Sequence, residues 1–106
     1  MHKFTTLKAL KALDEVDTEF AELFQNGSMT IEFYRPEEID QQQPHTKDEL
    51  YVIASGSGKF LYEDDYTEFE AGDVFFVPAG KLHKFEEFTN NFTTWVFFYG
   101  PEGGEE

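Results

Sequence analysis

From residue 28 onward, short apolar runs alternate with turn-forming residues, and this spacing most constrains the fold. Runs such as 49–55 and 92–99 are rich in aromatic and β-branched residues, which favour strands. The Gly-Ser-Gly sequence at 56–58 is typical of a tight turn, because glycine adopts positive φ at little cost. Many short strands at close intervals indicate an antiparallel sandwich or barrel rather than a βαβ protein.

The run at 29–34 has the alternation of a strand with one buried face. Met29, Ile31 and Phe33 alternate with Thr30 and Glu32, and side chains two apart share a face of a strand. We expect further strands at 49–55, 59–63, 67–70, 74–77, 83–88 and 92–99.

The segment ahead of these strands predicts a short helix over residues 17–27. Phe20, Leu23 and Phe24 fall at positions i, i+3 and i+4, which would give one apolar stripe on a helix. Asn26-Gly27 would end it. The preceding run at 7–13, LKALKAL, fits either an extension of this helix or an edge strand.

The length of 106 residues predicts a single domain. Within residues 1–106 we expect an N-terminal extension with the short helix over 1–27, a barrel over 28–100 and a frayed acidic tail over 101–106. Aromatic residues make up 18% of the chain, and thirteen of them are Phe. Bulky aromatic side chains suit a core between two sheets.

The formal net charge of −14 argues against two classes of partner. Nucleic acid and anionic membrane are both polyanionic, and no basic patch is present to bind them. The chain has no cysteine, which excludes disulfides and thiolate chemistry. No apolar run is long enough to span a bilayer, and the N-terminus lacks the features of a signal peptide. We therefore expect a cytoplasmic protein.

Four side chains form a candidate metal site. Gln43, His45 and Glu49 have the same parity, so a strand running through them would place all three on one face. His83 begins a later strand. These nitrogen and oxygen donors suit Fe(II), Mn(II), Ni(II), Co(II) or Zn(II), and two histidines with one carboxylate are also the ligands of the non-haem iron facial triad.

The spacing around the first three residues resembles the first motif of the cupin family, which is written G(X)5HXH(X)3,4E(X)6G. Gln43, His45, Glu49 and Gly56 stand at the spacing of its last four positions. Gln43 replaces the first histidine, and an amide oxygen is a neutral and weaker ligand than imidazole. The first glycine of the motif has no match here.

The second motif of that family, G(X)5PXG(X)2H(X)3N, resembles residues 72–87. Pro78, Gly80 and His83 follow Gly72 at the expected spacing, and Glu87 stands in place of the asparagine. The two motifs together span about two-fifths of the chain.

The resemblance implies an all-β, antiparallel double-sheet jelly-roll barrel, with the short helix near its N-terminus. It implies a divalent transition metal held by His45, Glu49 and His83, with Gln43 as a candidate fourth ligand. It also implies a homodimer, formed through an exchanged N-terminal strand or through paired sheet edges. Such pairing would cover exposed strand edges.

Two functions fit this site, and a purely structural or interaction role with a vestigial site is a weaker third. The first is a metal-dependent, dioxygenase- or isomerase-like enzyme acting on a small oxygenated molecule, with Glu49 as a catalytic base and the metal as a Lewis acid. The second is a non-catalytic module that binds a small-molecule ligand with or without metal. The fold hosts both functions and does not choose between them, and the ligand set does not fix the metal.

Overall fold

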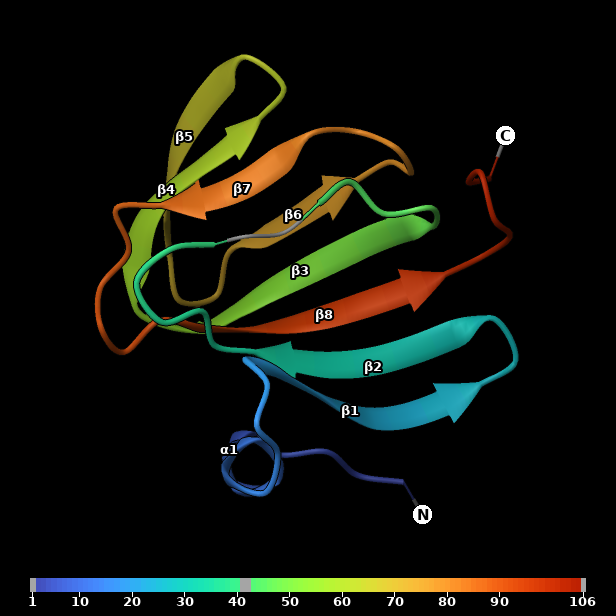
Figure 1. Ribbon diagram of the computed structural model, residues 1–106, viewed down its shortest axis with the longest axis vertical. Coiled ribbons are helices and arrows are strands. Elements are labelled where there is room, and N and C mark those ends of the chain that lie inside the picture. The colour runs from blue at the N-terminus through green and yellow to red at the C-terminus, as the bar shows by residue number, and fades with distance from the viewer. Residues whose placement is uncertain (1, 41–42, 106) are drawn as a thin grey trace.

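The computed structural model describes residues 2–40 and 43–105. Its elements are α1 (Thr6–Asp14), β1 (Phe20–Asn26), β2 (Met29–Tyr34), β3 (Asp48–Ser55), β4 (Ser57–Tyr62), β5 (Asp65–Glu70), β6 (Val74–Val77), β7 (His83–Glu86) and β8 (Thr93–Tyr99). A five-stranded sheet has the order β1-β2-β8-β3-β6, and a three-stranded sheet has the order β5-β4-β7 (Figure 1). All strand pairs are antiparallel. The predicted all-β, double-sheet barrel with a short helix is confirmed.

The predicted position of the helix is wrong. Residues 6–14 form α1, and Phe20–Asn26 within the predicted helix form β1. The register of β1 against β2 shifts between Glu22 and Phe24, as in a β-bulge, where an extra residue breaks the alternation of side chains. The apolar residues of β1 therefore have the spacing of a helical stripe although they belong to a bulged strand. Since β1 belongs to the larger sheet, the barrel strands begin at Phe20 rather than at residue 28.

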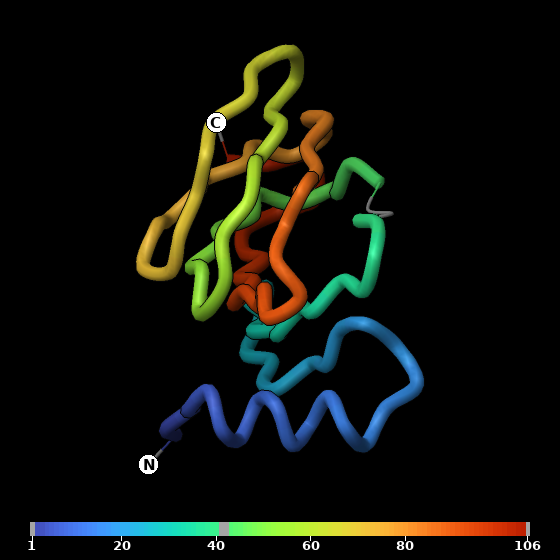
Figure 2. Tube along the Cα trace, turned by 90° about the vertical axis from the view of Figure 1, so that its left-hand side faces the viewer, coloured from blue at the N-terminus to red at the C-terminus, as the bar shows by residue number. Residues whose placement is uncertain are grey.

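The helix α1 packs on the outer face of the five-stranded sheet. The Thr5 hydroxyl caps it by accepting a hydrogen bond from the Lys8 backbone amide at 3.1 Å. Its buried Ala9 and Leu13 cluster with Ala21 and Phe33. In both views α1 lies at the opposite end of the molecule from the β4–β5 hairpin (Figures 1 and 2).

This packing sets the direction of the side chains on β2. Phe33 points outward into the cluster with the helix, so Glu32 and Tyr34 on either side of it point to the inner face of the sheet. The polar face of this strand, which the alternation alone would leave to solvent, therefore lines the inside of the barrel.

Aromatic side chains fill the space between the two sheets. Tyr51 and Phe85 are fully buried, with ring centroids 4.9 Å apart. Phe60, Phe69 and Phe92 pack in the same cluster. Because this part of the barrel is filled, a ligand cavity must lie elsewhere on the inner face.

The tail is not frayed over its described part. The backbone amide of Glu105 donates to Asp48 Oδ2 at 2.9 Å, and that of Gly103 donates to the Thr46 carbonyl at 2.6 Å. These bonds fasten the tail to the start of β3. Within the described residues, no helix is long and apolar enough to cross a membrane.

Candidate metal centre

The pairing of β3 with β6 positions two of the predicted ligands. Glu49 lies opposite Val77, and the turn that follows Val77 carries the chain from the five-stranded sheet to β7 in the other sheet. His83 is the first residue of β7. The two side chains therefore meet between the sheets, where both are buried.

His45 reaches the same place from a loop rather than from a strand. The strand β3 begins only at Asp48, so Gln43, His45 and Glu49 do not share one strand, and the condition under which parity would place them on one face is not met. The His45 carbonyl accepts a hydrogen bond from the Gly80 amide at 2.7 Å, which ties the loop to the β6–β7 turn. Gly80 has a φ of 80°, a conformation that favours glycine.

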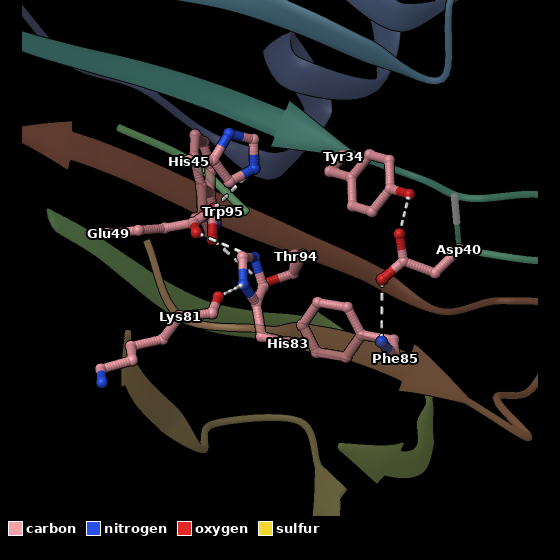
Figure 3. A network of polar contacts seen from close by, with 9 residues as sticks. All are labelled: Tyr34, Asp40, His45, Glu49, Lys81, His83, Phe85, Thr94 and Trp95. Atoms are coloured by element: carbon pink, nitrogen blue, oxygen red, sulfur yellow. Dashed lines mark hydrogen bonds and ion pairs between the residues drawn. The ribbon is translucent and has the colours of Figure 1, made fainter. Parts of the chain in front are cut away.

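Three of the four predicted ligands come together (Figure 3). His83 Nε2 lies 3.0 Å from Glu49 Oε1, and His45 Nε2 lies 3.8 Å from Glu49 Oε2. One donor atom from each residue falls within 4.8 Å of the others. Gln43 is exposed on the same loop, and its role as a fourth ligand stays a prediction.

The donor atoms of this cluster fit a cation. His83 Nδ1 lies 2.9 Å from the Lys81 carbonyl, which can only accept a hydrogen bond, so the ring donates there. In neutral His83 the lone pair of Nε2 then faces the Glu49 carboxylate. With His83 in this neutral form, neither Glu49 oxygen nor His83 Nε2 has a hydrogen-bond partner. Buried polar atoms without a partner are costly, and a cation bound between them would remove that cost.

The spacing of the donors also suits a transition metal. Two neighbouring ligands of an octahedral ion bound at about 2.1 Å lie about 3.0 Å apart, and this matches the 3.0 Å between His83 Nε2 and Glu49 Oε1. Imidazole and carboxylate donors suit several divalent ions of the first transition row. The Lys81 carbonyl would hold the His83 ring in its ligating orientation.

The two histidines differ in their acid–base behaviour. Burial lowers the pKa of His45, and the Glu49 carboxylate offsets this only in part. Burial also acts to lower the pKa of His83, but the adjacent Glu49 carboxylate and the Lys81 carbonyl outweigh it, so the net shift is upward. A metal at Nε2 of His83 would compete with a proton for this nitrogen.

A buried carboxylate anchors the loop that carries His45. Asp40 accepts a hydrogen bond from the Tyr34 hydroxyl at 2.7 Å and another from the Phe85 amide at 2.8 Å. Figure 3 shows this bridge from the end of β2 to β7 beside the metal cluster. Nothing in the sequence marks Asp40 as a site residue, because its role depends on contacts made only in the folded barrel.

A cavity of about 610 Å³ opens beside the cluster over β1, β2 and β8. Its lining consists of Asp17, Thr18, Glu19, Phe20, Glu32, Tyr34, His45, Val96 and Phe98. Glu32 was not predicted as a site residue. Burial, together with the negative charges of Glu22 and Glu49, raises its pKa to about 7.

Comparison with known proteins identifies the family. The sequence profile of the cupin domain matches residues 30–98. The chain belongs to the cupin family. An uncharacterized protein of Streptomyces coelicolor is 30% identical to this cupin over 105 residues, which cover 91% of this chain and 99% of that protein.

Solved structures extend the likeness in fold. A protein of unknown function from Rhizobium leguminosarum superposes with a TM-score of 0.70 at 16% identity, over 95% of this cupin and 98% of that chain. The DMSP lyase DddQ of Ruegeria pomeroyi superposes with a TM-score of 0.66 at 23% identity, over 76% of this cupin and 46% of that chain. At these identities the two structures show the fold alone.

Proposed function

We propose that this cupin binds a divalent transition metal through His45, Glu49 and His83 and acts on a small oxygenated molecule that enters from the adjoining cavity. The observation that carries the proposal is a buried group of donor atoms, both oxygens of Glu49 and Nε2 of His83, that contact one another but have no hydrogen-bond partner outside the cluster. Packing alone does not explain such a site, because burying apolar side chains of similar size at these positions would cost less free energy than burying these polar ones.

The bound metal would supply Lewis acidity toward an oxygen of the substrate. The protein's own part is to orient and to exclude water. The Lys81 carbonyl fixes the His83 ring, and the aromatic core closes the inner side of the site. His45, which is half-buried and lines the cavity, marks the side from which a substrate would approach. A dioxygenase- or isomerase-like reaction, with Glu49 as the base, is part of this proposal.

The deciding experiment is elemental analysis of the untagged protein after exposure to Fe(II), Mn(II), Ni(II) or Zn(II) and removal of excess metal. We expect about one metal ion per chain and its loss in the His45→Ala/His83→Ala double variant. His2→Ala is the matched control, because His2 is exposed and packs against Phe24 away from the cluster. If the wild type holds no metal under any of these conditions, the metal-binding proposal is refuted.

A non-catalytic binding module is the second candidate, and the aromatic wall of the cavity favours it. Phe20, Tyr34 and Phe98 line the cavity, and such side chains bind ligands without reacting. Turnover of any bound compound by the metal-loaded protein, lost in Glu49→Gln, would select the enzyme. Binding without turnover would select the module.

We also propose that the protein is a homodimer. The edge strand β6 presents Val74 and Phe76, whose exposed fractions are 57% and 51%. An uncovered edge with apolar side chains favours pairing with a second chain. Light scattering coupled to size exclusion would give the mass. A monomer at micromolar concentration would contradict the homodimer proposal and would have no bearing on the metal-binding proposal.

A further inference from the structure

We infer that the cavity beside the metal centre takes an organic cation, a small ammonium compound that also carries an oxygen function. The inference rests on the proposed function, since it names the class of molecule that the same site would bind.

The cavity wall is acidic and has no balancing cation. Asp17, Glu19 and Glu32 line it, and none of the described lining residues is Lys or Arg. Arg35 lies close by, since its amide donates to the Glu19 carbonyl, but its side chain pairs with Asp14 at 3.7 Å. Anionic molecules such as phosphates or sulfates would therefore meet repulsion here, whereas a cation would be attracted.

The register of the strands concentrates this charge. Glu22 of β1 lies directly opposite Glu32 of β2, and directly opposed like charges destabilise a pair of strands. Glu32 is only partly exposed and has a raised pKa, because burial and the neighbouring carboxylates disfavour its charge. A bound cation would relieve both costs.

A second feature, independent of the acidic side chains that line the cavity wall, also points to a ligand. Glu49 is fully buried, and apart from its contacts with His45 and His83 its two oxygens have no hydrogen-bond partner. It lies 3.8 Å from Nε2 of His45, which itself lines the cavity. The cavity therefore leads to an unsatisfied site, where the oxygen function of the ligand would meet the metal.

The aromatic side chains of the wall suit the apolar part of an ammonium ion. Phe20 lies opposite Tyr34 across β1 and β2, and Phe98 of β8 lies opposite Thr30 of β2. All three rings line the cavity. Aromatic faces attract ammonium groups, and quaternary ammonium ligands are commonly bound by such rings.

The probes are choline and its neutral analogue 3,3-dimethyl-1-butanol, which has the same shape without the charge. Calorimetric titrations would use both the metal-free and the Zn(II)-loaded protein. We expect choline to bind at least about tenfold more tightly than the alcohol, and its affinity to fall as salt is added. Equal affinity for the two probes, or no binding of choline to either form, would overturn the inference.

Variants locate the binding. Glu32→Gln should weaken choline binding about tenfold and leave the alcohol unaffected. Glu68→Gln makes the same change on β5, outside the cavity, and should change the affinity for choline less than twofold. Equal effects of the two variants would mean that the overall charge alone attracts choline, which contradicts the inference.

The metal-free titrations separate this inference from the proposed function. Selection of choline by a protein that never takes up metal would refute the metal proposal and keep the cationic ligand. Stoichiometric metal binding without selection of choline would support the metal proposal and refute the cationic ligand.

Discussion

Replacing Glu32 by glutamine should stabilise the protein at alkaline pH, because the fold holds this carboxyl group where its charge is disfavoured. Burial and the charges of Glu22 and Glu49 raise its pKa from 4.5 to about 7. The folded state therefore keeps its proton to higher pH than the unfolded state does. Below pH 4.5 the group is protonated in both states and has no effect on stability. As the pH rises from 4.5 to about 7, the unfolded state ionises first and the folded state loses stability relative to it, and above about pH 7 this loss is constant.

The size of this effect follows from the shift. A change of about 2.5 pKa units corresponds to about 3.4 kcal/mol at full ionisation. Glu32 is partly exposed, and solvent screening reduces this to about 1 to 2 kcal/mol. At pH 5.5 Glu32 is mostly ionised in the unfolded state but not in the folded state, and the destabilisation that it causes should be less than half of that at alkaline pH.

Urea unfolding of the metal-free protein in the presence of a chelator measures this free energy. The comparison is between wild type and Glu32→Gln at pH 5.5 and pH 8.5, both above the isoelectric point of about 4.4. The variant should be more stable at pH 8.5, and its advantage should shrink at pH 5.5. A variant that is equally or less stable at pH 8.5 would refute the electrostatic reasoning about the cavity. Since Glu32→Gln should fold at least as well as wild type, its loss of choline affinity could not be attributed to unfolding.

Two further predictions concern the frame around the site. Asp40→Ala should lower the free energy of unfolding by about 2 to 4 kcal/mol, because it removes the acceptor of both the Tyr34 hydroxyl and the buried Phe85 amide. Tyr34→Phe removes only one of these hydrogen bonds and should lower it by about 1 kcal/mol. Equal losses for the two variants in urea unfolding would contradict this account. Gly56→Ala should cost more than about 3 kcal/mol, because its Cβ would lie 2.6 Å from the Phe92 Cα at a φ of +86°. Gly72→Ala is the control, because Gly72 has a φ of +95° and open space around the position of a Cβ. Its free energy of unfolding should fall by about 1 kcal/mol. If thermal or urea unfolding ranked the two variants in the opposite order, the steric argument would be refuted.

The strands after residue 28 could be predicted from the sequence, whereas the N-terminal segment could not. Alternation and turn residues located β2 to β8 to within a few residues, because these strands pair without long irregular segments. In β1 the register shift between Glu22 and Phe24 breaks the alternation. Phe20, Leu23 and Phe24 then fit the period of a helix as well as that of a bulged strand. Only the pairing of β1 with β2 resolves this ambiguity.

The candidate metal ligands could likewise be predicted from the sequence, whereas the cavity residues could not. His45 and Glu49 are close in sequence, and the pairing of β3 with β6 brings the segment leading to His83 beside them, so motif spacing was enough to find all three. Glu32 joins them only through the pairing of β2 with β8, in which Glu32 lies opposite Val96, far along the chain. Its inward direction depends further on α1 covering the opposite face of β2. A motif can therefore locate the candidate metal site, but the groups that would select a ligand follow from the packing of the helix and the order of the sheet.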